Sequence, residues 1–122
     1  MSVPKFETFT QFWPYYLQEH SLASTRAWHF VGTTISIGWA IAGLVQLSPL
    51  YLLPAIVSGY AFAWVSHFFI EKNRPATFTY PRWSFIADFR MWGLMLTGRI
   101  NAELKKHNVV PKNVTAPAAQ VG

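Results

Sequence analysis

Residues 27–70 read AWHFVGTTISIGWAIAGLVQLSPLYLLPAIVSGYAFAWVSHFFI, a stretch without any Asp, Glu, Lys or Arg. An α-helix rises ~1.5 Å per residue and a bilayer core is ~30 Å thick, so one membrane-spanning helix takes roughly 20 residues. The stretch is therefore long enough for two spans. Ser48 and Pro49 form a turn signal near its middle. We predict a helical hairpin whose spans cover about residues 28–47 and 50–69.

A pair of core helices in a soluble bundle is the alternative to a membrane hairpin. Such helices normally present a polar outer face, and neither of the two apolar segments has one. The composition also favours the membrane, because only 12% of the residues are charged. An ordinary soluble domain carries about 25%. We therefore predict an all-α integral membrane protein.

The positive charges indicate the orientation of the hairpin. The turn at its tip is uncharged, whereas Arg26 precedes the first span and Lys72, Arg74 and Arg82 follow the second. By the positive-inside rule, both termini are expected in the cytoplasm, at the inner membrane of a bacterium or the endoplasmic reticulum of a eukaryote. The net charge of +5 does not predict nucleic-acid binding, because the basic residues flank apolar segments instead of forming one patch.

The segments outside the hairpin are predicted to lie at the membrane interface. Residues 6–20 carry aromatic side chains at helical spacing, which indicates an amphipathic interfacial helix that is kinked or broken at Pro14. Residues 83–98 are apolar but contain charged groups, so they predict a half-buried or re-entrant helix that Ser84 caps. Residues 1–108 then form one domain, and residues 109–122 form a disordered tail.

The histidines are expected to meet at one level of the membrane. His29 opens the first span and His67 closes the second, and the two spans are antiparallel. Glu71 follows His67 by one helical turn, and His20 precedes His29 by a short connection. The hairpin therefore brings three imidazoles and one carboxylate together at the cytoplasmic interface. Small residues on the facing sides of both spans suit close packing of helices. The same residues could also pack against a second copy, so a homo-oligomer is one possible state.

This set of side chains points to a metal site. Imidazole and carboxylate ligands suit iron(II), zinc or manganese. The chain has no Cys, which excludes thiolate chemistry and Cys-bound metal. The alternative is that the histidines only hydrogen-bond to the backbone or to lipid headgroups, and the spacing alone leaves both interpretations open.

Other ionisable residues have two interpretations each. Asp88 is a ligand or orients one through a hydrogen bond; the alternative is a salt bridge to a nearby arginine. A fatty-acid carboxylate would suit an arginine partner. The candidates for that contact are Arg26, Arg74 and Arg82, which could instead set the topology and touch headgroups.

Two stretches together resemble a known family. Residues 16–33 read YLQEHSLASTRAWHFVGT, and residues 64–78 read WVSHFFIEKNRPATF. Over about residues 6–99 the chain resembles the small membrane 2-hydroxy fatty acid dioxygenases. The resemblance implies an Fe(2+)-dependent dioxygenase that uses O2 to shorten a 2-hydroxy fatty acid by one carbon (α-oxidation). It implies His20, His29 and His67 as metal ligands, and the spacing adds Glu71 and Asp88 as catalytic candidates.

Two other functions remain as alternatives. A non-catalytic membrane hairpin would bind lipid or a partner protein, and its histidines would be structural. A metal-dependent membrane hydrolase would use the same ligands without O2. Metal content separates the first alternative from an enzyme, and the need for O2 separates the second.

Overall fold

The computed structural model describes residues 4–111, in which all regular structure is helical. The five α-helices are α1 (Phe9–Gln18), α2 (Ala23–Gln46), α3 (Leu52–Val65), α4 (Pro81–Leu96) and α5 (Ile100–Lys106). Three short elements complete the order: the 3-10 turns η1 (Pro49–Tyr51) and η3 (Ala76–Phe78), and the π-helical segment η2 (Ser66–Glu71). The all-α prediction is confirmed. Most of the predicted disordered tail lies outside the described residues.

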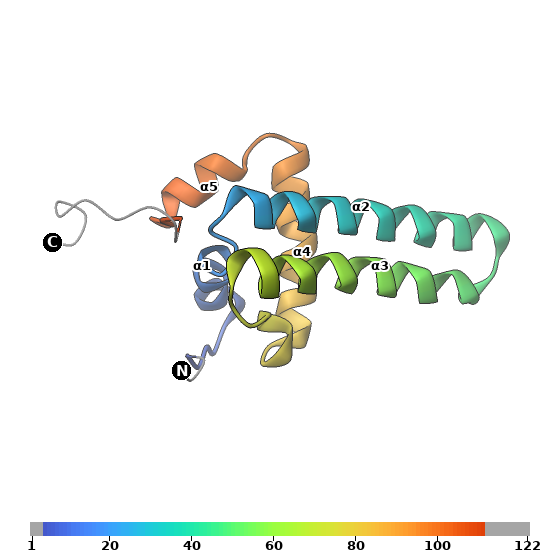
Figure 1. Cartoon of the computed structure of the whole chain (residues 1–122), viewed down its shortest axis with the longest axis horizontal. Helices are drawn as coiled ribbons and strands as arrows, with labels where there is room; N and C mark the ends of the chain where they lie inside the picture. The colour runs from blue at the N-terminus through green and yellow to red at the C-terminus, as the bar shows by residue number, and fades with distance from the viewer. Residues whose placement is uncertain (1–3, 112–122) are drawn as a thin grey trace, which may run out of the picture.

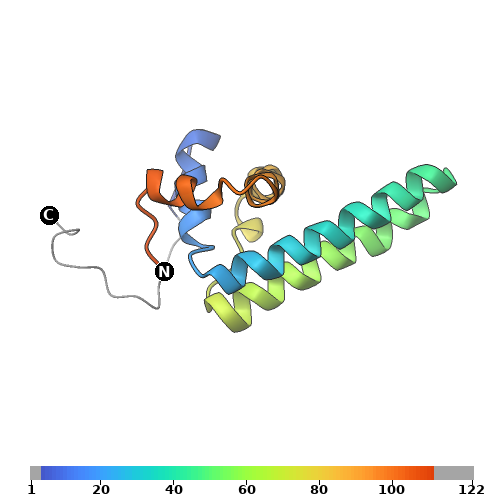
Figure 2. The same cartoon turned by 90° about the horizontal axis from the view of Figure 1, so that it is seen from above.

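The helices α2 and α3 form an antiparallel hairpin that projects from the rest of the molecule (Figure 1 and Figure 2). Two continuous helical stretches, Ala23–Gln46 and Pro49–Glu71, are long and apolar enough to cross a membrane. The predicted hairpin is therefore confirmed, although α2 begins earlier than expected. The turn begins at Leu47, whose φ of 52° lies in the left-handed region and ends α2.

Small side chains allow the two hairpin helices to approach closely. Gly32 of α2 faces Phe62 of α3, and a Cβ added at Gly32 would lie 2.5 Å from the Phe62 Cβ. No other residue type fits this contact without a shift of the helices. The predicted small-residue face of α3 is also found, since Ala55 and Ala63 are buried against α2.

The remaining helices gather at the open end of the hairpin, where α4 lies across it (Figure 1 and Figure 2). The apolar face of α1 packs on α4 in a core that includes Phe12, Trp13, Tyr16 and Leu17 of α1 and Ala87 and Met91 of α4. The helix α1 continues through Pro14, so the predicted break does not occur there. The helix α4 buries one face against the rest of the molecule and exposes the other, and its predicted place in the membrane stays a prediction.

The expectation that Ser84 caps α4 is wrong. The helix begins earlier, at Pro81, and its N-cap residue is Tyr80, which makes no side-chain cap. Proline suits the first helical position because its missing N–H would have no helical partner there. Ser84 therefore lies inside the first turns of α4, where it is buried.

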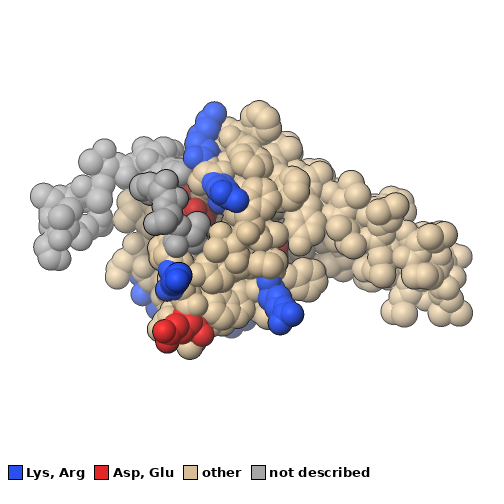
Figure 3. All heavy atoms as spheres, turned by 90° about the horizontal axis from the view of Figure 1, so that it is seen from below, with Lys and Arg blue, Asp and Glu red and all other residues tan. Residues whose placement is uncertain are grey.

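Charge and apolar surface are separated along the molecule. Figure 3 shows charged side chains around the base of the molecule and none on this face of the hairpin's far end. Large apolar side chains are exposed there instead, with Leu47 at 87% and Leu50 at 78%. A surface of this kind suits contact with lipid and is costly in water.

Candidate metal centre

Three histidines from three segments meet at the base of the hairpin. His20 lies in the connection between α1 and α2, His29 lies in the second turn of α2, and His67 lies in η2. The Nε2 atom of His20 is 3.2 Å from that of His29 and 2.9 Å from that of His67. One ring nitrogen from each lies within 4.8 Å of the others, and all three side chains are buried. The predicted convergence is therefore found for the three imidazoles.

The Nδ1 atoms of two of these histidines face hydrogen-bond acceptors. His20 Nδ1 lies 2.7 Å from the Tyr16 carbonyl oxygen, and His67 Nδ1 lies 2.6 Å from Asn73 Oδ1. The Asn73 amide in turn donates to the Glu19 carbonyl at 2.9 Å, which fixes its orientation. An acceptor opposite Nδ1 places the ring proton on Nδ1 and leaves Nε2 unprotonated, with a free lone pair.

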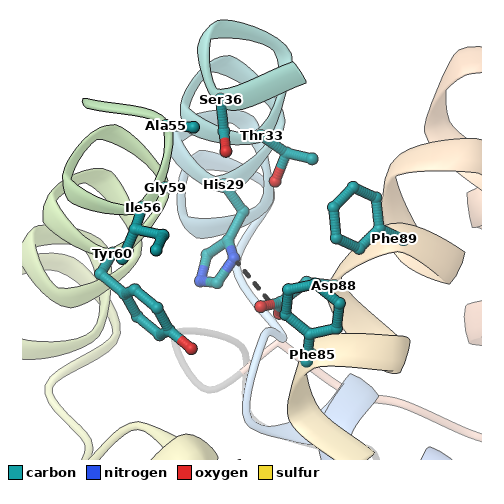
Figure 4. A pocket seen from close by; sticks show the side chains of 10 residues that line it. All are labelled: His29, Thr33, Ser36, Ala55, Ile56, Gly59, Tyr60, Phe85, Asp88 and Phe89. Carbon is teal, nitrogen blue, oxygen red and sulfur yellow. Dashed lines mark ion pairs between the residues drawn. The ribbon is translucent and has the colours of Figure 1, made fainter. Parts of the chain in front are cut away.

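The third histidine faces a carboxylate. His29 Nδ1 lies 3.9 Å from Asp88 Oδ1, a contact longer than a direct hydrogen bond (Figure 4). The Tyr16 hydroxyl donates to the same Asp88 oxygen, and the Tyr16 ring stacks on His20 with ring centroids 4.1 Å apart. Burial raises the pKa of the Asp88 carboxyl to about 7, although the Tyr16 hydrogen bond lowers it. Tyr16 thus contacts His20 directly and His29 through Asp88.

The chemistry of the donor set fits a cation. With the ring protons of His20 and His67 on Nδ1, their Nε2 lone pairs point at each other, and such an arrangement is repulsive unless a proton or a metal cation lies between them. Burial and the two neighbouring imidazoles lower the pKa of His20 well below its usual range. The neutral imidazole is the form that binds a metal, and an acceptor behind the ring, as at His20 and His67, is the usual support of a metal-binding histidine. The residues present therefore suit a divalent cation such as iron or zinc.

A π-helical segment presents His67. The helix α3 changes to π-helix over Ser66–Glu71 and ends at Lys72, which has a φ of 62°. The Asn73 N–H then bonds back to the His67 carbonyl at 2.9 Å, so the chain reverses directly behind His67. Single π-turns inside helices are rare and are found frequently at functional sites.

Glu71 has hydrogen bonds that differ from those of a metal ligand. Its carboxylate is fully buried and accepts from the Ser21 N–H, the Ser21 hydroxyl, the Leu22 N–H and the Thr25 hydroxyl. These donors form the start of α2, whose N-cap residue Leu22 has no side-chain acceptor. Glu71 thus caps α2 from another element. The group of potential ligands contains the three histidines and not Glu71.

The three arginines lie apart from the histidine nitrogens. The Arg26 guanidinium is buried and donates to the carbonyls of His20 and Ser21, at 2.8 and 2.9 Å. It therefore holds the connection that carries His20. Arg74 and Arg82 are exposed and line two shallow surface hollows. None of the three lines a cavity at the histidines.

Two cavities adjoin the centre, and both are lined by His29 and Asp88. The larger one, about 80 Å³, lies between α2, α3 and α4 (Figure 4). Figure 4 shows the Tyr60 hydroxyl and Asp88 pointing into it, and its apolar wall is formed by Ala55, Ile56, Phe85 and Phe89. The smaller cavity, about 10 Å³, is lined by all three histidines and by Ser84.

One comparison with known proteins, against family models, finds a match over most of the chain. Residues 6–100 match the family model described as 2-hydroxy-palmitic acid dioxygenase Mpo1-like. Neither a curated protein nor a solved structure matches the chain. The match covers the hairpin, all three histidines and both cavities. The chain therefore belongs to the Mpo1-like family of 2-hydroxy-palmitic acid dioxygenases.

Proposed function

We propose that the protein is an iron(II)-dependent dioxygenase that shortens 2-hydroxy fatty acids by one carbon. The observation that carries this proposal is the meeting of three buried histidine nitrogens beside an apolar cavity. The family description supplies the substrate class, a 2-hydroxy fatty acid. A non-catalytic hairpin would not need three buried imidazoles next to an apolar cavity.

The chain's own residues hold and orient the centre in this proposal. His20, His29 and His67 would bind the iron through Nε2, and three protein ligands leave further positions open for substrates. The bound iron would supply activation of O2 and of the substrate's oxygen atoms. Asp88 orients His29 from behind, and Glu71 acts as a positioning residue because it fixes the start of α2.

The larger cavity is the proposed site of the acyl substrate. Its volume of about 80 Å³ would hold part of an acyl chain, and the rest of the chain would lie in the surrounding lipid. Its apolar wall includes Ile56 and Phe85, which are exposed on the outer surface of the helices at 56% and 57%. In a bilayer these side chains would touch lipid, so an acyl chain can enter sideways from the membrane. The polar end at His29 and Asp88 would receive the hydroxy-acid group.

No arginine lies at this polar end. The structure therefore gives no support to a carboxylate clamp formed by Arg26, Arg74 or Arg82. The substrate carboxylate and 2-hydroxyl would instead lie at the cavity end formed by His29 and Asp88, next to the site where the histidines would hold the iron. The proposed reaction also balances: R–CH(OH)–COOH and one O2 give R–COOH, CO2 and water, without a further reductant.

Oxygen consumption with a defined substrate tests the proposal. Protein purified in detergent and loaded anaerobically with iron(II) is expected to consume O2 with 2-hydroxypalmitate and to release an acid one carbon shorter. Palmitate, which lacks the 2-hydroxyl, is the control and should give no turnover. His67→Ala should lose both iron and turnover. An iron-loaded protein that turns over no 2-hydroxy acid would contradict the proposal.

A further inference from the structure

Ser84 is a buried polar side chain that the proposed chemistry does not yet use. It lies in α4 with 1% of its surface exposed. Within the described residues, its hydroxyl oxygen has no hydrogen-bond partner. Nearly all buried polar groups in proteins have one, because a buried hydroxyl without a partner destabilises the fold. A buried hydroxyl without a partner therefore needs a specific explanation.

The surroundings of Ser84 point to a ligand. Ser84 lines the small cavity of about 10 Å³ together with His20, His29 and His67. A cavity needs about 10–15 Å³ of such free volume to hold one water molecule, so this one has room for a ligand of about that size and not for an acyl chain. The larger cavity lies on the other side of His29 and Asp88, and Ser84 does not line it. The two cavities thus offer separate places for a long and a small molecule.

Helical geometry explains how Ser84 reaches this place. Because α4 begins at Pro81 and not at Ser84, the serine hydroxyl is free from a capping role. The Ser84 N–H bonds to the Tyr80 carbonyl at 2.9 Å, as in any helical turn. The neighbouring positions Phe85 and Asp88 line the larger cavity. The helix α4 therefore contributes side chains to both cavities from adjacent positions.

We propose that the Ser84 hydroxyl donates a hydrogen bond to a small ligand held in the small cavity at the three-histidine centre. The ligand class is a molecule about the size of water that accepts a hydrogen bond. This inference rests on the proposed function, because it requires a metal bound by the three histidines. Ser84 then selects and holds the small co-substrate, whereas the larger cavity holds part of the acyl chain.

Azide binding to the cobalt(II)-loaded protein tests the role of Ser84. Azide is a small anion whose coordinating nitrogen takes the place of one water and accepts hydrogen bonds, and its binding to cobalt(II) changes the visible absorption. The full chain in detergent is loaded with cobalt(II), its metal content is measured, and azide is titrated. Ser84→Ala is expected to keep the metal content and to weaken azide binding about 3- to 10-fold, the effect of one lost hydrogen bond.

Ser58→Ala is the matched control, because Ser58 lies in α3 and its hydroxyl donates to the Pro54 carbonyl at 2.7 Å. It should leave azide binding unchanged. Equal azide affinity in wild type and Ser84→Ala, or no azide binding to a cobalt-loaded wild type, would overturn the Ser84 proposal alone. A wild-type protein that holds no metal would instead remove the proposed function, and the Ser84 proposal with it.

Discussion

At the scale of single residues, Asn73 is the support of His67. Its side-chain oxygen lies 2.6 Å from His67 Nδ1, and its amide is anchored on the Glu19 carbonyl. Asn73→Ala removes this acceptor, so the His67 ring is free to turn and to exchange its tautomer. We expect metal affinity to fall by roughly 10–100-fold, the usual effect of losing such a partner. Competition with a chelator measures the metal affinity.

Asn101→Ala is the control for this change. Asn101 is exposed on α5, and its loss should leave the metal affinity at the wild-type value. The same affinity in Asn73→Ala and Asn101→Ala would show that the contact between Asn73 and His67 does not matter for the metal.

Sequence reasoning predicts which histidines meet but not what supports them. His29 and His67 are predictable because antiparallel spans place their ends at one depth. Asn73 was missed because no helical period connects it to His67: the π-turn and the left-handed Lys72 create that contact. Tyr16 was assigned only to an amphipathic face, although its position four residues before His20 on a helix was a usable signal.

The same π-turn affects the interpretation of Glu71. An α-helical spacing from His67 to Glu71 predicts one shared face, and hence one shared ion. The structure changes the helical register over these residues, and the Glu71 carboxylate meets the start of α2 instead. A local departure from α-helix cannot be predicted from the spacing of residues in the sequence, because it depends on the tertiary contacts that stabilise it.

At the scale of elements, Glu71 links η2 to the start of α2. Glu71→Gln removes the charge and places an amide donor against groups that are themselves donors. We expect the free energy of unfolding to fall by roughly 2–4 kcal/mol, since hydrogen bonds to a buried charge are lost. Thermal unfolding in detergent measures the change. Glu7→Gln, at an exposed position before α1, is the control and should have no effect.

The contact between Gly32 and Phe62 sets the spacing of α2 and α3. Gly32→Ala forces a Cβ into Phe62, so the helices must separate near His29. We expect a destabilisation of about 1–3 kcal/mol and a weaker metal site. Gly38→Ala is the matched control, because a Cβ there meets nothing within 4 Å. It should be neutral or slightly stabilising, and equal melting temperatures for the two variants would contradict this packing argument.

Glu103 holds α5 against α1 and α4. It accepts from the Trp13 indole N–H at 2.7 Å and lies 3.7 Å from Arg90. The Trp13 hydrogen bond lowers the pKa of Glu103, with Lys106 and Arg90 adding to it. A lowered pKa in the folded state stabilises the fold above the unfolded-state pKa near 4.5, and this contribution is lost as the pH falls through the folded-state value.

Glu103→Gln should therefore remove the pH dependence that Glu103 gives to the stability of α5. At pH 7 we expect faster hydrogen exchange in α5 than in wild type, corresponding to about 1 kcal/mol, because a charge-assisted bond becomes a neutral one. The difference should disappear as the pH falls through the lowered folded-state pKa of Glu103. A difference that stays constant over this pH range would show that the Glu103 charge is not the cause.

At the scale of the whole molecule, the hairpin and the helical base have different surroundings. The hairpin exposes large apolar side chains along its length, whereas the charges gather at the base beside the histidines (Figure 3). A molecule of this shape would place the centre near the boundary between lipid and water. In the proposed function, an acyl chain would remain in the bilayer there while its polar end reached the centre. The location of the site follows from the hairpin's length and from the charges that flank it.

The orientation of the hairpin gives the last prediction. Because the native sequence has no Cys, single-cysteine variants report topology without background labelling. Ser48→Cys lies at the turn, and Asn101→Cys lies in α5 at the base. By the positive-inside rule we expect a membrane-impermeant maleimide to label Ser48→Cys in intact cells and Asn101→Cys only after permeabilisation. The reverse pattern would invert the orientation, and labelling of both positions in intact cells would show that α2 and α3 do not cross the bilayer.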